Sequence, residues 1–346
     1  MTPLNLLQRI NRKFGSLWLA VDRKRAARIQ NGKPAWSDYV FLPYFHWMEI
    51  GMDILKDRLP NLLDPTSDDA QVLVNTVNTM ATVGTWRVTQ DIIRFDEDLY
   101  RELIATPFAG NIPSEVLLRL PAWCIYLETP DLLFQGRSVH GVFASLGHFD
   151  GQDILMLNAL QDTMLQQFPV ALGDFDLEKS ISKLNETARK GLKRFLPSVL
   201  LHEDDSSKEK KDLVRRCLNL LLYTCAYGFS DKEDAEAHDG SQIKRPVPRK
   251  TSKGYRLFPP DKPVIRELGK TFGDALRADR AVTHSRQTEG PGKTRRPHVR
   301  RGHWHGFWHG TRVIKEGIEP IPKTFRIRWL PPMTVGVDTG ADHGEG

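Results

Sequence analysis

The 346-residue chain has few cysteines and no apolar run long enough to cross a membrane. Its three cysteines, Cys124, Cys217 and Cys225, form no C-x-x-C pair, which fits a reducing cytoplasm better than a disulfide framework. The longest apolar segment, Cys217 to Phe229, has 13 residues, too few to span a bilayer. Charges interrupt the N-terminal segment MTPLNLLQRINRKF, unlike a signal peptide. We therefore expect a soluble cytoplasmic protein.

Common catalytic motifs are also missing. The chain has no G-x-S-x-G, no P-loop, no G-x-G-x-x-G and no H-E-x-x-H. Cys124 lies in a predicted central strand and is better explained as a core residue than as a nucleophile. Asp96, Glu97 and Asp98 indicate an acidic helix start. No residue set proposes a reaction, so we expect neither an enzyme nor a cofactor, although a metal-dependent nuclease stays open as an alternative.

Charge is unevenly distributed along the chain. Residues 244–328 hold 22 Lys and Arg against 7 Asp and Glu, whereas residues 1–243 hold 27 against 33. A neutral-to-acidic body with a basic C-terminal third favours an anionic partner for that third. A solvated basic surface without a partner is the simpler alternative.

Periodicity predicts an α+β protein: an N-terminal helical region and a central, mainly antiparallel sheet completed by C-terminal strands. Within it we expect a long helix over Ala70–Arg94, a β-hairpin at Asp150-Gly151 and an amphipathic helix over Val264–Arg280. Cys217 and Cys225 fall on an apolar helical pattern from Asp212 to Tyr227 and are expected to be buried.

Five segments are predicted. They are a helical region over 1–110, sheet and helices over 111–230, a basic proline-rich connector over 231–263, a helix with a His/Trp/Arg-rich hairpin joining the central sheet over 264–335, and a flexible tail over 336–346.

The densest cluster of chemically versatile side chains lies at 295–310, with four histidines, two tryptophans and four arginines. Alternation predicts a strand here, paired with the strand Thr324–Leu330. Side chains two apart share a face of a strand. We therefore expect Trp304 and Trp308 to face the core, and His303 and His305 to share a cationic face with the arginines of the second strand.

Three interpretations of this cationic face stay open. His303 and His305 lie about 7 Å apart along a strand and, with His298, suit a metal-dependent nuclease, although the nearby arginines oppose a cation. Arginines interleaved with aromatic residues are typical of nucleic-acid binding. In the third interpretation the hairpin is structural, and each imidazole donates to a carbonyl or a carboxylate.

The run Arg296–Trp308 (RPHVRRGHWHGFW), followed by Phe325–Trp329 (FRIRW), resembles the C-terminal signature of a type V-A anti-CRISPR family. Leu120–Tyr126 (LPAWCIY) and Gly84–Arg87 (GTWR), with Asp96-Glu97 shortly after, add weaker matches. The resemblance covers roughly Ala70 to the C-terminus.

This family suppresses biosynthesis of the type V-A CRISPR effector nuclease and is found on phages and plasmids. The resemblance implies a binding protein that recognises the N-terminal segment of the nascent nuclease and lowers its messenger RNA, with the ribosome or RNA as a further partner and no membrane. A plasmid- or phage-encoded RNA- or DNA-binding protein using the basic C-terminal third is the alternative. The candidate partner-binding residues are His298, Arg300, Arg301, His303, His305, His309, Arg326 and Arg328.

Overall fold

The computed structural model describes residues 1–30, 36–59, 61, 67–108, 110–149, 151–162, 164–183, 208–228, 243–252, 254–287, 298–309 and 324–335. Within these ranges, no helix combines the length and the hydropathy that a bilayer span requires.

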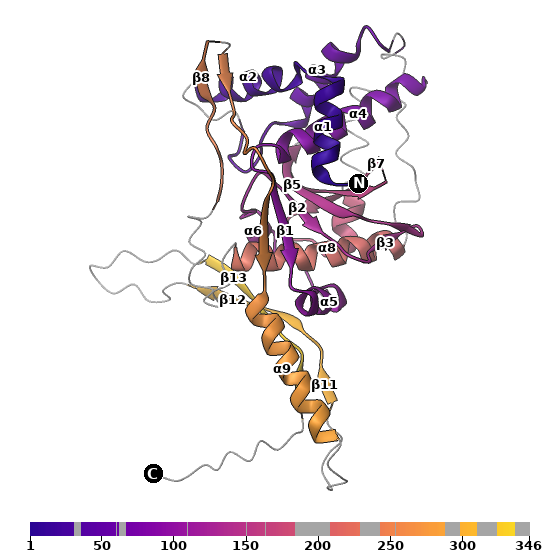
Figure 1. Ribbon diagram of the computed structural model, residues 1–346, viewed down its shortest axis with the longest axis vertical. Coiled ribbons are helices and arrows are strands. Elements are labelled where there is room, and N and C mark those ends of the chain that lie inside the picture. The colour runs from indigo at the N-terminus through magenta and orange to yellow at the C-terminus, as the bar shows by residue number, and fades with distance from the viewer. Residues whose placement is uncertain are drawn as a thin grey trace, which may run out of the picture.

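Helices dominate the first hundred residues and return around the sheet (Figure 1). Their bounds are α1 Pro3–Lys13, α2 Leu17–Gln30, α3 Tyr44–Leu55, α4 Asp68–Trp86, α5 Glu97–Ala105, α6 Ser114–Leu117, α8 Lys208–Tyr227 and α9 Lys270–Gln287. Local chemistry explains their starts. In α1, the Thr2 hydroxyl accepts from the Asn5 amide at 3.2 Å, and Pro3 occupies the first turn, where its missing N–H costs nothing.

The central sheet has six strands in the order β10-β1-β2-β5-β6-β7. Their bounds are β1 Asp91–Phe95, β2 Cys124–Glu128, β5 Gly141–Phe149, β6 Gln152–Gln161, β7 Met164–Leu172 and β10 Val264–Leu268. Strand β1 runs parallel to β2 and β10, and the other three pairings are antiparallel. The β5–β6 hairpin is confirmed, and Gly151 in its turn has a φ of 78° that glycine adopts without strain.

In the part of the chain that the structure describes, eight shorter strands lie outside this sheet, in four pairs: β3 Leu133–Phe134 with β4 Arg137–Ser138, β8 Arg249–Thr251 with β9 Gly254–Arg256, β11 His298–Arg300 with β14 Met333–Val335, and β12 His303–His309 with β13 Thr324–Leu330.

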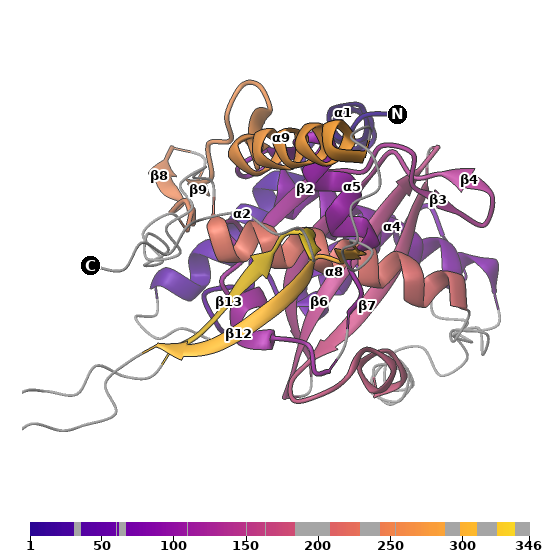
Figure 2. The same ribbon diagram turned by 90° about the horizontal axis from the view of Figure 1, so that it is seen from below.

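Helices cover both faces of the central sheet (Figures 1 and 2). On one face, Leu6 of α1 and Trp86 of α4 pack with Tyr126 and Phe143. On the other face, α5 and α8 bury a larger core that includes Cys217 and Cys225. These two thiols are buried as predicted, and burial raises the pKa of each to about 12. Cys124 is also buried in the sheet, in agreement with the core interpretation.

The α+β class, the N-terminal helices and the mainly antiparallel sheet are confirmed, and β10 is the C-terminal strand that completes it. Two expected helices are shorter than predicted. Helix α4 ends at Trp86, and Asp91–Phe95 is strand β1; likewise, Val264–Leu268 is strand β10, and α9 begins at Lys270. Both segments are short apolar runs, for which helical and strand periodicity cannot be distinguished, and their pairing with each other decides the outcome.

The His/Trp/Arg hairpin does not join the central sheet, in contrast to our expectation. Strands β12 and β13 form their own two-stranded sheet. The edge strands of the central sheet are β7 and β10, neither of which pairs with the hairpin, and the hairpin packs with its apolar face on the helical layer instead. The division of the chain into five segments stays a prediction.

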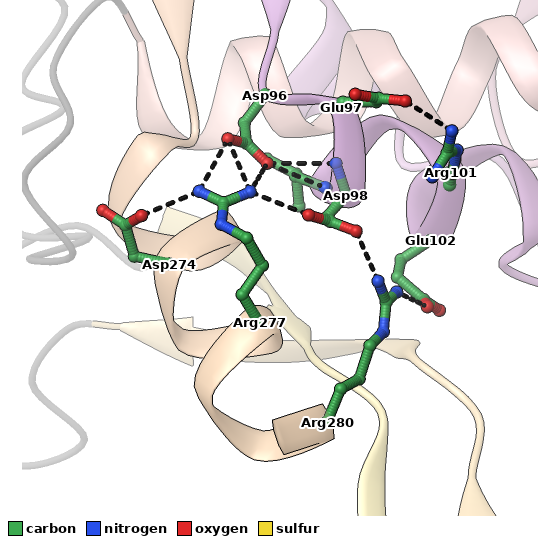
Figure 3. A network of polar contacts seen from close by, with 9 residues as sticks. Asp96, Glu97, Asp98, Arg101, Glu102, Asp274, Arg277 and Arg280 are labelled. Atoms are coloured by element: carbon green, nitrogen blue, oxygen red, sulfur yellow. Dashed lines mark hydrogen bonds and ion pairs between the residues drawn. The ribbon is translucent and has the colours of Figure 1, made fainter. Parts of the chain in front are cut away.

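Acidic residues at the start of α5 bind arginines of α9 (Figure 3). Asp96 caps α5 by accepting from the amides of Asp98 and Leu99 at 3.0 and 3.4 Å, which confirms the acidic helix start. Arg277 donates to Asp96 at 3.1 Å and to Asp98 at 2.8 Å. Helix α9 and the start of α5 approach so closely that a Cβ added to Gly273 would lie 1.9 Å from an Asp96 oxygen. This contact holds α9 against the sheet domain.

We expect Asp98→Asn to lower the melting temperature at pH 7. The hydrogen bond from Arg277 holds the pKa of the Asp98 carboxyl below its usual range, so the charged carboxylate stabilises the fold. This contribution is present above the unfolded pKa of about 4 and is lost as the pH falls through the lower folded pKa. Thermal unfolding followed by circular dichroism from pH 7 to pH 3 should therefore show the two proteins converging.

Glu97→Gln is the matched control. Its partner Arg101 lies one turn along the same helix, and both side chains are more than half exposed, so the pair contributes little. An equal loss in both variants, or a loss in Asp98→Asn that persists at pH 3, would contradict the role of Asp98.

Candidate functional site

Strands β12 and β13 pair as the sequence predicts. Trp304 lies opposite Trp329, His305 opposite Arg328, and Phe307 opposite Arg326. Directly opposed residues of an antiparallel pair share a face. The hairpin therefore has one aromatic face and one face that carries histidine and arginine.

The aromatic face is anchored to α8 by buried polar contacts. The Trp304 indole N–H donates to Asn219 Oδ1 at 2.8 Å, and the Asn219 amide donates to the Thr106 carbonyl at 2.8 Å. Trp329 is fully buried, and its indole N–H donates to the Thr106 hydroxyl at 3.2 Å. Tyr227 accepts from the Trp329 backbone amide at 3.2 Å. Because these groups lie out of water, each bond they make is costly to lose.

Close packing continues along the same face of the hairpin. Gly306 lies opposite Ile327, and a Cβ at this position would come within 2.6 Å of the Phe325 ring. A side chain here would displace that ring. Arg119, just after α6, donates to the Phe325 carbonyl at 2.6 Å and so ties β13 to the body of the protein.

The opposite face is cationic and aromatic. His305 and Arg328 are exposed, while Phe307 and Arg326 are half-buried. The His305 and Phe307 rings are stacked, with centroids 6.4 Å apart and planes 24° from parallel. Each ring lies opposite an arginine on the neighbouring strand. The structure thus brings four neighbouring side chains together into what we call the His/Arg face: His305, Phe307, Arg326 and Arg328.

His303 also lies on the His/Arg side of the hairpin, at its base. Its Nδ1 is 3.3 Å from the Arg301 carbonyl oxygen, a contact in which the ring nitrogen carries the proton and donates. This is the arrangement that the structural interpretation predicted for these histidines. We therefore treat His303 as partly structural and His305 as the exposed imidazole of the face.

Trp308 does not belong to the core, contrary to our expectation. Its side chain is 61% exposed and its ring contacts Phe325, 5.3 Å away. Strand alternation correctly assigns Trp308 to the face of Trp304, but burial also requires an opposing element. Figure 2 shows the hairpin lying across α8, with the end that holds His309 and Thr324 projecting past the helices.

The remaining predicted site residues lie close by along the chain. His298 and Arg300 are in β11, where they are opposite Val335 and Met333 of β14. Arg301 is exposed in the link to β12, and His309 ends β12. The side chains of His298, Arg300 and His309 lie outside the described residues, as does the connection 310–323.

Within the ranges that the structure describes, no three His, Cys, Asp or Glu side chains converge on a point where a metal ion would bind. Burial raises the pKa of the three cysteine thiols, so none of them is a ready nucleophile at neutral pH.

The residues that position the hairpin were not found from the sequence. Asn219 is fully buried in α8 between apolar neighbours, and Thr106 lies just after α5. An asparagine inside a long apolar helical run is a usable signal, since a buried amide requires partners. The sequence does not indicate that one of those partners is an indole 85 residues away.

The fold and the His/Arg face define an α+β protein with an exposed cationic and aromatic surface. The chain belongs to the anti-CRISPR type V subtype A2 family, whose AcrVA2-like profile matches residues 93–337. The family prediction is thereby confirmed, and with it an anti-CRISPR function linked to type V-A systems.

The chain is similar to a solved structure and to a curated protein. A crystal structure of AcrVA2 superposes with a TM-score of 0.61 over 96% of this chain and 99% of that chain, at 18% sequence identity, which establishes a shared fold. Protein FinQ of Escherichia coli is 25% identical over 267 residues, which are 73% of this chain and 75% of FinQ.

We expect Asn219→Ala to lower the free energy of unfolding by about 1–3 kcal/mol, because the Trp304 N–H and the Thr106 carbonyl would both lose a partner in the core. Urea denaturation measures the change. Asn75→Ala is the control, since Asn75 is exposed on α4 and its side-chain oxygen accepts from Gln71 one turn away on the same helix. If the two substitutions had equal effects, the hairpin anchor would be unimportant for stability.

Proposed function

We propose that this protein is an anti-CRISPR inhibitor that binds the N-terminal segment of a nascent type V-A effector nuclease and lowers its messenger RNA. Its family membership supports the target system. The observation that carries the binding part is the His/Arg face, an exposed surface of paired rings and guanidinium groups on a rigidly anchored hairpin. The partner-binding residues are those named from the sequence, with His305, Arg326 and Arg328 at the centre.

The chemistry of this face suits a polypeptide. Guanidinium groups bind carboxylates through two parallel hydrogen bonds, and the stacked rings of His305 and Phe307 offer a flat apolar contact. A rigid surface of this kind loses little conformational entropy when it binds an extended chain. The side chain of Trp329, which is fully buried on the aromatic face of the hairpin, supplies that rigidity.

Message loss is proposed to follow from recognition at the ribosome. The basic C-terminal third, with 22 Lys and Arg between residues 244 and 328, suits a position near ribosomal RNA or the message. We propose that the protein acts in the bacterial cytoplasm, without an enzymatic step of its own, and is encoded by a phage or plasmid.

We expect His303→Ala combined with His305→Ala to restore the message of the effector nuclease while leaving most of the protein folded, since His305 is exposed. Arg300→Ala with Arg301→Ala should act in the same way. Message levels in cells that express the effector, together with pull-down of its N-terminal segment, measure the effect.

His140→Ala is the matched control, because His140 is exposed on a different part of the chain. Since His303 donates to a backbone carbonyl, His305→Ala alone separates recognition from stability. If the double variant merely unfolds and His305→Ala retains full activity, the face is structural. No binding and an unchanged message across several type V-A effectors with the wild-type protein would refute the proposal itself.

A second candidate function is RNA or DNA binding through the same region. The observation that favours it is the exposure of Trp308 at the end of a hairpin that also carries the stacked His305 and Phe307 rings. Exposed rings beside arginines are the usual platform for unpaired bases.

In this second case, affinity for a single-stranded RNA oligonucleotide should fall steeply as the salt concentration rises. In a plot of log affinity against log salt concentration, the slope should steepen by about one for every one to two phosphates that the protein neutralises. Fluorescence anisotropy between 50 and 300 mM NaCl measures the slope, and Trp308→Ala should weaken binding. Binding that is absent or insensitive to salt would exclude this function.

A further inference from the structure

Strand β10 lies at the edge of the central sheet, and its hydrogen bonds to β1 define which backbone groups face outward. The Val264 amide donates to the Gln90 carbonyl at 3.0 Å, and the Leu268 carbonyl accepts from the Asp96 amide at 2.9 Å. In a parallel pair, alternate residues bond to the same neighbour. The N–H and C=O groups of Ile265 and Glu267 therefore face away from β1. Among the described residues, no strand pairs with this outer edge.

A groove of about 550 Å³ begins where β10 starts. Thr89, Phe258 and Val264 are among its lining residues, and Lys244 and Arg245 contribute basic side chains. The groove lies at the amino ends of the parallel strands, because Thr89 precedes β1 and Lys244 bridges to Ala122, just before β2. A chain that continued along the outer edge of β10 would run past it.

Thr89 is an unusual lining residue. It is 92% buried, and among the residues that the structure describes no atom forms a hydrogen bond with its hydroxyl. Buried hydroxyl groups almost always have a partner, because leaving one unpaired costs free energy. Thr89 lines the groove, but its hydroxyl oxygen is itself closed off from solvent, so a ligand in the groove would meet the side chains of Lys244 and Arg245 rather than this oxygen.

The surroundings of the groove favour an acidic ligand with apolar side chains. Between residues 243 and 268 the sequence has eight Lys and Arg and two Asp and Glu. Three large apolar side chains in the same segment are more than half exposed: Val247, Phe258 and Ile265. Exposed apolar residues within a basic surface are typical of a binding site rather than of a solvated linker.

We propose that the outer edge of β10 and this groove together bind an extended acidic peptide as an added strand. Ile265 and Glu267 exchange backbone hydrogen bonds with the peptide, and the groove takes an acidic side chain that pairs with the basic rim of Lys244 and Arg245. This inference rests on the proposed function, in which it locates the backbone of the nascent segment.

The edge and the His/Arg hairpin are neighbours in the fold. Helix α9 follows β10 directly, and its Phe272 packs on Trp329 with ring centroids 6.1 Å apart. The carboxyl end of β10 therefore leads through the first turn of α9 to the aromatic face of the hairpin.

The test uses a fluorescein-labelled synthetic peptide that covers the N-terminal segment of a type V-A effector, with binding followed by anisotropy. Ile265→Pro removes the outward N–H but no hydrogen bond to β1, and proline is tolerated at such edge positions. We expect it to weaken binding about tenfold, the usual effect of losing one backbone hydrogen bond in a buried contact. Ile265→Val keeps the N–H and should bind normally.

Lys244→Gln combined with Arg245→Gln is a second variant, which removes the two basic side chains of the groove. It should weaken binding of the acidic peptide but not of a version in which Asp and Glu are replaced by Asn and Gln. A third measurement leaves the protein unchanged: peptides N-methylated at one position at a time should lose affinity at alternate positions, because only every second N–H of an added strand faces β10.

The outcomes separate this inference from the proposed function. If the wild-type protein binds no peptide, the proposed function fails. If it binds the peptide but Ile265→Pro binds equally well, or if N-methylation has no alternating effect, the peptide lies elsewhere and only the β10 assignment is overturned. If Ile265→Pro weakens the binding of an RNA oligonucleotide but not the binding of the peptide, the groove binds nucleic acid and the proposal is refuted.

Discussion

The turn between α4 and β1 is the constraint on which the rest of the structure depends, because distant parts of the chain meet there. Arg87 pairs with Asp22 of α2 in a buried ion pair, and Asp22 also accepts from the Leu257 amide. Asp91, fully buried, pairs with Arg266 of β10 at 2.8 Å. Burial raises the pKa of Asp22 and lowers that of Arg87, because each charged group loses its hydration there. Each charge therefore depends on the other for its stabilisation. The N-terminal helices and the C-terminal strand are thereby held to one sheet.

Two exposed surfaces follow this junction along the chain: the outer edge of β10 and the His/Arg face of the hairpin. Strand β10 adds an edge to the sheet, and α9 extends from it, held to α5 by the acidic and arginine residues of Figure 3. The β12–β13 hairpin then rests on α8 through Trp304 and Trp329. Binding energy at either surface is preserved only if the supporting core does not move. Buried asparagine and tryptophan contacts, which specify one geometry, are suited to that purpose.

Much of the site was predictable from local patterns. Alternation in residues 303–309 and 324–330 predicted the pairing, the face of every side chain and the burial of Trp329, since strand periodicity is a property of the backbone. Trp308 was assigned to the correct face but wrongly to the core, because exposure depends on where α8 ends relative to the hairpin. Asn219 and Thr106 escaped notice because their partners are far away in the sequence.

The sequence by itself determined the family, the α+β class, the two faces of the hairpin and the concentration of positive charge in the last third. These features depend on residue identity and on short-range periodicity. Only the tertiary structure decided that residues 91–95 and 264–268 are neighbouring strands, and that the His/Arg hairpin lies on α8 rather than in the central sheet. Short apolar segments fit a helix or a strand equally well, and pairing between segments more than 170 residues apart settles which one forms.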